Sequence, residues 1–232
     1  MLNAAETAGL MLRAVGGLAI YLLCPSARRP PLARSYKDID FVTSADSARE
    51  VAEFLAGLGY RPDEEFNRLH GHQRLYFWDV ANARQLDVFV ERFLMCHELD
   101  LGSRLGLHGR TLSPADLLLT KLQVVQVNEK DLKDAAALLA DLPIVKQGID
   151  PARVTGVLTT DWGWWRTATE TFDRVRDYAS SVDGFPGATT IAERIDELCA
   201  TISASPKSLK WKLRARVGER ARWYEEPEEI EG

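Results

Sequence analysis

The hydrophobic pattern of this 232-residue chain changes near residue 110, and that change constrains the fold more than any other feature of the sequence. Before it, short apolar runs alternate with segments whose apolar residues recur at helical spacing; after it, helical spacing prevails. Strands interleaved with helices build a small sheet, whereas a run of helices builds a helical layer. We therefore expect an α/β (α+β) protein with a small mixed-sheet core at residues 1–110 and a helical C-terminal domain at residues 111–232.

Individual elements follow from periodicity and from helix start and stop signals. In the first part we expect strands over residues 12–15, 39–43, 74–78 and 85–90, and helices over residues 18–24 and 44–58. In the second part we expect six helices, which cover residues 115–127, 131–142, 150 onward, 161–180, 189–203 and 205–224. The acidic segment at residues 225–231 is expected to be disordered.

Composition places the chain among ordinary soluble proteins, with 46% hydrophobic and 27% charged residues and a net charge of −5. This charge excludes a uniformly basic nucleic-acid coat protein. The three cysteines are far apart, so neither a disulfide framework nor a zinc knuckle is indicated. The apolar run at residues 15–24 is too short to span a bilayer, and no basic stretch precedes it. We therefore expect a cytoplasmic protein with no membrane partner.

Two aspartates alternate on one of the predicted strands. Asp38 and Asp40 are two residues apart, so their side chains point to the same face of a sheet. Two carboxylates held side by side repel each other unless a cation lies between them, and hard divalent cations prefer oxygen ligands. A third acid, Asp87, lies on another predicted strand. Three carboxylates on neighbouring strands are able to bind Mg²⁺ or Mn²⁺ and to serve a two-metal displacement at phosphorus.

A glycine pair precedes these acids in the chain. Gly16 and Gly17 lie where a predicted strand turns into a helix. A backbone without Cβ lets phosphate groups approach the helix N-terminus closely. The sequence therefore predicts a phosphate cradle beside the carboxylates.

Together these motifs resemble the signature of the nucleotidyltransferase superfamily, which has the polymerase-β-like fold. The elements that carry the resemblance are Val15-Gly16-Gly17, Asp38-Ile39-Asp40 and a later strand aspartate, Asp87. The resemblance implies a nucleotidyltransferase core that moves a nucleoside monophosphate from an NTP to an acceptor. It also implies that Asp38, Asp40 and Asp87 bind metal and that Gly16 and Gly17 bind the nucleotide phosphates. The chain departs from the usual pattern in having Gly17 in place of serine, and in a long Pro- and Arg-rich stretch before Asp38.

Later motifs narrow the resemblance. Arg84-Gln-Leu-Asp87, Asp116-Leu-Leu-Leu-Thr-Lys121 and Lys130-Asp131-Leu-Lys-Asp134 are similar, in that order, to motifs of the AbiEii and MenA-like nucleotidyltransferases, which are toxins of toxin–antitoxin systems. The match covers roughly residues 12 to 140. It implies active-site roles for Lys121, which would also hold the triphosphate, and for Asp131, with the choice between Asp131 and Asp134 left open. It further implies tRNA 3′ ends as acceptors and an antitoxin protein as a partner.

Two basic segments are candidates for RNA contact. Residues 28–37 carry three arginines and Lys37 with no acid, directly before the predicted metal site, so Lys37 is also a candidate ligand of the triphosphate. Residues 207–222 carry seven basic residues and one acid, a local charge of +6 against −11 for the rest of the chain. Trp211 and Trp223 lie in or beside this second segment, either to stack bases or to pack inward.

Two other functions remain open at this stage. One is a small-molecule nucleotidyltransferase of the aminoglycoside type, for which an acidic cleft would suit a cationic acceptor. The other is a non-catalytic nucleotide-binding module on the same fold, which the loss of the serine hydroxyl at Gly17 would fit.

Overall fold

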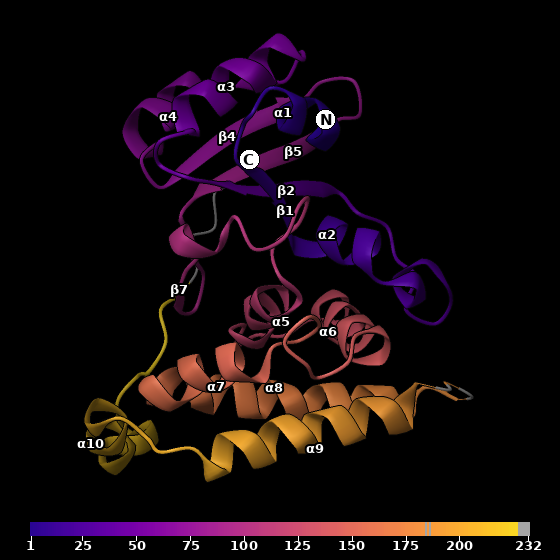
Figure 1. Ribbon diagram of the computed structural model, residues 1–232, viewed down its shortest axis with the longest axis vertical. Helices are drawn as coiled ribbons and strands as arrows, with labels where there is room; N and C mark the ends of the chain where they lie inside the picture. Colours follow the sequence, from indigo (N-terminus) through magenta and orange to yellow (C-terminus); the bar gives the residue numbers. More distant parts are fainter. Residues whose placement is uncertain (184, 186, 227–232) are drawn as a thin grey trace. The chain divides into compact units, whose positions relative to one another are not determined.

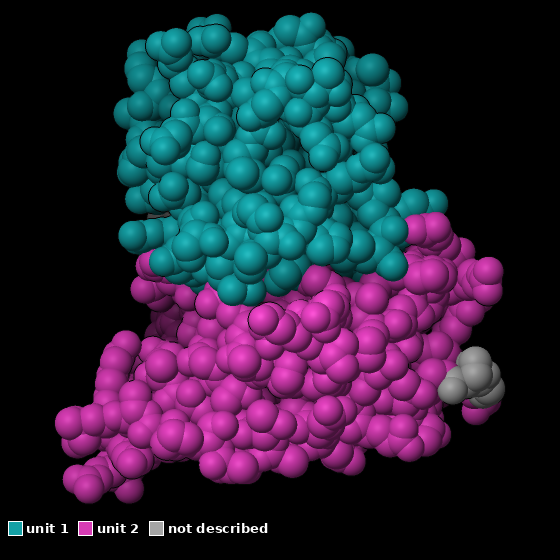
Figure 2. Space-filling view, in the orientation of Figure 1, with its two compact units in different colours: residues 1–23, 35–93, 99–113 teal, residues 24–34, 94–98, 114–232 magenta. Residues whose placement is uncertain are grey.

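The computed structural model describes residues 1–183, 185 and 187–226. The chain forms two compact units, coloured separately in Figure 2. Unit 1 comprises residues 1–23, 35–93 and 99–113, and unit 2 comprises residues 24–34, 94–98 and 114–232. The acidic segment that we expected to be disordered falls largely outside the described residues.

Unit 1 is built on a five-stranded sheet in the order β1-β2-β5-β4-β3 (Figure 1). The strands are Leu12–Val15 (β1), Asp38–Thr43 (β2), Arg61–Pro62 (β3), Arg74–Asp79 (β4) and Arg84–Val90 (β5). β2 runs parallel to β5, while the other neighbouring pairs are antiparallel. The sheet is therefore mixed, as the sequence predicts.

The two faces of this sheet differ in burial. Along β4, the side chains of Leu75 and Phe77 are buried, whereas Tyr76 and Trp78 between them are half-buried. The buried face is lined by aliphatic and aromatic side chains that include Phe41 on β2. The helices of this unit are Leu2–Thr7 (α1), Gly16–Leu23 (α2), Ala48–Gly57 (α3) and Glu64–His70 (α4). A short separate hairpin follows the sheet, with strands Arg92–Leu94 (β6) and Glu98–Asp100 (β7).

Unit 2 is helical. Its helices are Pro114–Leu122 (α5), Glu129–Asp141 (α6), Pro151–Thr160 (α7), Trp162–Ser181 (α8), Ala188–Ala204 (α9) and Leu209–Val217 (α10). Several begin at side chains that accept hydrogen bonds from the first turn, as Asn128 does for α6 and Asp161 does for α8. Helices α8 and α9 lie side by side, and both pack on α6 (Figure 1).

The predicted fold class is confirmed: a mixed-sheet α/β core is followed by a helical region. Three helix predictions need correction. α5 ends at Leu122 instead of residue 127. The predicted helix over residues 205–224 is α10, which ends at Val217 because Gly218 has a φ of +60°. The helix predicted over residues 44–58 begins only at Ala48. Among the described residues, no helix combines the length and apolarity needed to cross a bilayer.

Candidate active site

Gly16 and Asp40 approach each other at the start of α2. Gly16 has a φ of +65°, a conformation that L side chains rarely adopt. A Cβ atom at this position would overlap Oδ2 of Asp40. Val15, the residue before Gly16, is the register partner of Asp40 across the β1–β2 ladder. Glycine is thus required here both by backbone conformation and by the closeness of a carboxylate.

The three predicted aspartates share one face of the sheet. Asp40 is the register partner of Asp87 across the parallel β2–β5 pair, and Asp38 is the partner of Gln85. Since residues two apart on a strand point to the same side, Asp38, Asp40 and Asp87 all lie on the half-buried face. Asp38 is exposed, Asp40 is partly exposed, and Asp87 is buried with 2% of its surface accessible.

Asp87 is held by two neighbours that the sequence did not single out. Nε and Nη2 of Arg74 both lie 2.7 Å from Oδ1 of Asp87, and Nε2 of Gln85 donates to Oδ2 at 2.7 Å. Burial raises the pKa of Asp87, while Arg74 and Gln85 act in the opposite direction and the negative charge of Asp38 adds to the rise. The net effect is a raised pKa, so Asp87 is a stronger base than an exposed aspartate.

The carboxylates fit a divalent cation only in part. Asp38 and Asp40 offer adjacent oxygen ligands beside the glycine turn, which is the donor chemistry that Mg²⁺ or Mn²⁺ prefers. However, among the residues that the structure describes, no group of three His, Cys, Asp or Glu side chains is gathered as a metal ligand set. Asp87 is instead engaged by Arg74 and Gln85. Metal binding by Asp38, Asp40 and Asp87 stays a prediction.

Lys121 and the two candidate acids of α6 form a buried ion cluster in unit 2. Nζ of Lys121 lies 3.1 Å from Oδ1 of Asp131 and 2.9 Å from Oδ2 of Asp134. Asp134 is 2% exposed. Burial alone would raise its pKa, but Lys121 and Arg34 together hold the pKa of Asp134 below its ordinary value. Burial likewise opposes the charge of Lys121, and the two aspartates more than reverse that effect and raise its pKa.

Arg34 belongs to the same cluster. Its Nε and Nη2 donate to the two oxygens of Asp134 at 2.9 and 2.7 Å, a paired geometry that favours a fixed guanidinium. Ser26, in the same segment, donates through its backbone N–H and its hydroxyl to Oδ2 of Asp141 at 2.8 Å. The segment at residues 24–34 is thus bound to α6, and Arg34, which we expected to contact phosphate or RNA, serves this attachment.

The remaining predicted residues are placed as follows. Gly17 is buried in the first turn of α2, and Lys37 is exposed directly before β2. Trp211 and Trp223 pack inward, since their rings lie edge-on to Trp165 and Trp162 at centroid distances of 5.3 and 6.1 Å. The base-stacking role considered for these two tryptophans is therefore not supported by their placement.

The sequence alone gives little indication that Arg74 is a partner of Asp87. Arg74 precedes Asp87 by 13 residues and faces it only because β4 and β5 form a hairpin. The nearer basic residue of the Arg84-x-x-Asp87 pattern, Arg84, pairs instead with Asp79 at 2.8 Å. Pairing the predicted strands β4 and β5 in antiparallel register would have predicted that Arg74 lies near Asp87.

Comparisons with known proteins give few matches. No protein-family model matches this chain, and no curated protein matches it. Among solved structures, the chain is similar to the solution structure of the antibiotic-resistance factor ANT(2'')-Ia, described as showing substrate-regulated conformation dynamics. That similarity has 14% identity and a TM-score of 0.38, and it covers 78% of this chain and 89% of the other. The case for a function is therefore carried by the side chains of this chain.

Proposed function

We propose that this protein is a nucleotidyltransferase that depends on Mg²⁺ or Mn²⁺ and takes an NTP as its donor. The observation that carries the proposal is the contact between Gly16 and Asp40, with Asp38 and Asp87 on the same sheet face. A glycine turn that opens a helix suits phosphate groups, and adjacent carboxylates suit the cation that accompanies them. The two features meet at one end of β1 and β2.

Each predicted site aspartate and glycine of unit 1 has a role in this proposal. Asp38 and Asp40 hold the divalent cation, which neutralises charge on the triphosphate when bound. The backbone at Gly16 and Gly17 receives the β and γ phosphates. The acceptor hydroxyl oxygen bonds to the α-phosphorus while the bond to the β-phosphate oxygen breaks and pyrophosphate leaves. Asp87 takes the hydroxyl proton, a role that its raised pKa favours.

Residues of unit 2 enter by resemblance to the AbiEii and MenA-like enzymes. Contact of Lys121 with the triphosphate stays what that resemblance implies, and within unit 2 Asp131 orients Lys121. The distance of 3.1 Å between Nζ of Lys121 and Oδ1 of Asp131 supports the role of Asp131. Asp134 is buried and bound by both Arg34 and Lys121, so we assign it to holding the cluster together. The proposal thus gives different roles to the two aspartates that the sequence left as alternatives.

RNA is the acceptor we propose, with the tRNA 3′ end as the specific candidate. Support comes from α10 and the turn after it, where Lys212, Arg216 and Arg220 are all exposed. Cationic rows of this kind track a phosphate backbone. A toxin role, with an antitoxin as protein partner, belongs to the same proposal and follows from the resemblance alone.

Two alternatives have an observation in their favour. A small cationic acceptor would be attracted by the three carboxylates on the half-buried face of the sheet. A non-catalytic nucleotide-binding module would be consistent with the engagement of Asp87 by Arg74. The first alternative keeps the transfer chemistry, whereas the second removes it.

A transfer assay separates these functions. The purified protein is incubated with each labelled NTP, Mg²⁺ or Mn²⁺, and either total tRNA or a cationic amino sugar such as kanamycin. Asp40→Ala serves as the inactive control, and its circular dichroism shows whether it folds. If label appears on tRNA with the wild-type protein and not with Asp40→Ala, the result supports the proposal. If label appears on kanamycin and not on tRNA, the result selects the small-molecule enzyme. Transfer that persists in Asp40→Ala refutes the site, and no transfer to either acceptor favours the binding module.

A further inference from the structure

The half-buried face of the sheet carries more than carboxylates. Strand register arranges its side chains in rows that cross the sheet, and two of these rows include the predicted aspartates or lie beside them. One row consists of Asp40, Asp87 and Tyr76. The other consists of Asp38, Gln85, Trp78 and Arg61. The members of both rows differ by two residues along each strand, so they all point to the same side.

Tyr76 and Trp78 are therefore the aromatic neighbours of the carboxylates. On β5, Asp87 is the register partner of Tyr76, and Gln85 is the register partner of Trp78. Neighbouring strands are about 4.8 Å apart. Both rings are half-buried, while their neighbours Leu75 and Phe77 on the opposite face are buried. Two large aromatic rings thus stay accessible beside the proposed reaction centre.

The ring of Tyr76 is supported on its other flank. Phe66 of α4 lies edge-on to it, with a centroid distance of 6.0 Å. Burial raises the pKa of the Tyr76 hydroxyl, and the charges of Asp87 and Asp63 raise it further. The hydroxyl therefore keeps its proton at neutral pH and is able to donate a hydrogen bond to the acceptor edge of a nucleobase.

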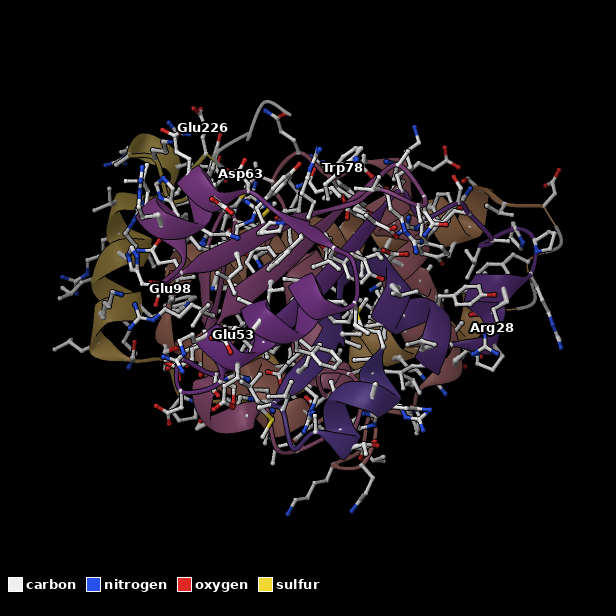
Figure 3. The ribbon with its side chains drawn as sticks, turned by 90° about the horizontal axis from the view of Figure 1, so that it is seen from above. Arg28, Glu53, Asp63, Trp78, Glu98 and Glu226 are labelled. Atoms are coloured by element: carbon white, nitrogen blue, oxygen red, sulfur yellow. The ribbon has the colours of Figure 1, made fainter. Side chains whose placement is uncertain are left out.

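A basic residue completes the second row. Arg61 on β3 is exposed and is the register partner of Trp78, which is labelled in Figure 3. It lies three strand spacings from Asp38, about 14 Å. The carboxylates would repel a phosphate placed beside them, so a polyanionic acceptor needs a cation at the far end of the row. Arg61 supplies that cation, with the aromatic rings between it and the acids.

We propose that Tyr76 and Trp78 form an acceptor subsite that stacks the terminal nucleobase of an RNA strand, with Arg61 receiving a backbone phosphate. The order along the sheet, from carboxylates through aromatic rings to Arg61, matches the order of hydroxyl, base and next phosphate at an RNA end. Aromatic stacking of this kind tolerates any base, because every base has a π-face. The inference rests on the proposed function and specifies its acceptor site.

Binding without turnover tests this subsite directly. The probe is a short fluorescent single-stranded oligoribonucleotide with a free 3′ hydroxyl, titrated into the full-length protein in Mg²⁺ without NTP. Trp78→Ala should raise its Kd about tenfold, and Trp78→Tyr should restore most of the affinity. Leu69→Ala, which removes a side chain of the same unit that is 57% exposed, should leave the Kd unchanged. Unchanged affinity for the oligoribonucleotide in a folded Trp78→Ala protein overturns the proposal. The proposal is also overturned if the wild-type protein binds kanamycin more tightly than RNA and loses that binding in Trp78→Ala.

Steady-state kinetics keeps this inference apart from the proposed function. Trp78→Ala should raise the KM for the RNA acceptor about tenfold and leave the KM for the NTP unchanged. If transfer to RNA occurs and the acceptor KM does not respond, the subsite is wrong while the enzyme assignment stands. If no transfer occurs with any acceptor, the enzyme assignment fails, and the titration alone decides whether Tyr76 and Trp78 bind RNA.

Discussion

Arg74 contacts Asp87 through two of its nitrogens, Nε and Nη2, each 2.7 Å from the same carboxylate oxygen. The guanidinium also lies over the ring of Phe89, 5.1 Å from its centroid. Arg74 therefore compensates a carboxylate that is only 2% exposed, in a position where the proposed chemistry needs a base. Oδ1 of Asp87 is able to bind a divalent cation only if Arg74 releases it.

Replacement of Arg74 tests this competition. Arg74→Ala should tighten Mn²⁺ binding, because it removes a positive charge and frees Oδ1 of Asp87. It should also lower the free energy of unfolding in the absence of metal by about 3 kcal/mol, since a buried carboxylate loses its partner. Mn²⁺ binding is measured by electron paramagnetic resonance and unfolding by urea titration. Arg49→Ala, at an exposed pair on α3, is the matched control. Weaker Mn²⁺ binding in Arg74→Ala would mean that Arg74 supports the cation site.

The turn at Gly16 gives a second prediction. Gly16→Ala should lower the free energy of unfolding by more than about 1 kcal/mol, because alanine is strained at a φ of +65° and its Cβ overlaps Asp40. Gly156→Ala is the control, since this helical glycine has nothing within 4 Å of an added Cβ and should be neutral or stabilising. Thermal and urea unfolding measure both. Wild-type stability in Gly16→Ala would show that the turn is free to change conformation.

The strands and the acidic face could be predicted because their signals are local. Short apolar runs predicted the strands β2, β4 and β5, and the two-residue spacing of Asp38 and Asp40 predicted that both lie on one face. Ser113-Pro114 and Asp150-Pro151 are helix start signals in the sequence, and α5 and α7 begin at these two prolines. Each of these features is decided by a few consecutive residues.

The partners of those side chains could not be predicted, because they depend on register and packing between distant segments. Arg34 and Asp134 are 100 residues apart, and the guanidinium we expected at phosphate is bound to a carboxylate on α6. Trp211 and Trp223 flank a basic segment, yet packing against other tryptophans turned them inward. Tyr76 and Trp78 were not predicted as site residues, because the alternation along β4 shows only that one face of the strand is less buried than the other.

The two acids of α6 should differ sharply in their contribution to stability. Asp134→Asn should lower the free energy of unfolding by about 3 kcal/mol or more, because Arg34 and Lys121 both lose their shared buried partner. Asp131→Asn removes one contact of Lys121 at a more exposed carboxylate and should cost less than half as much. Urea unfolding of the two isosteric variants gives the comparison directly. Equal losses would contradict the structural role assigned to Asp134.

His97 makes unit 2 sensitive to acid. Burial lowers the pKa of His97 from 6.5 to about 4, partly offset by Asp161, and its ring stacks on Trp164 with Nε2 2.9 Å from the Thr167 hydroxyl. The unfolded chain takes up this proton first as the pH falls, so stability decreases between about pH 6.5 and pH 4 and is unaffected above that range. The contribution approaches about 3 kcal/mol at the acid end. His97→Gln should be less stable at neutral pH but should show a shallower loss across the same window, measured by urea unfolding at a series of pH values. An identical pH slope in both proteins would show that His97 does not carry this dependence.

The exposed cations of α10 and its following turn should govern the salt dependence of RNA binding. Lys212, Arg216 and Arg220 face outward, and each phosphate contact on single-stranded RNA contributes about −0.7 to the slope of log K against log salt. Replacing all three by glutamine should therefore reduce that slope by about 2 and weaken binding most at low salt. A triple variant at exposed basic positions elsewhere, Arg49, Arg68 and Lys146, changes the net charge equally and should leave the slope almost unchanged. Fluorescence titration of one oligoribonucleotide at several salt concentrations measures all three proteins. Equal slopes in the two triple variants would show that net charge, and not the placement of these cations on α10, determines binding.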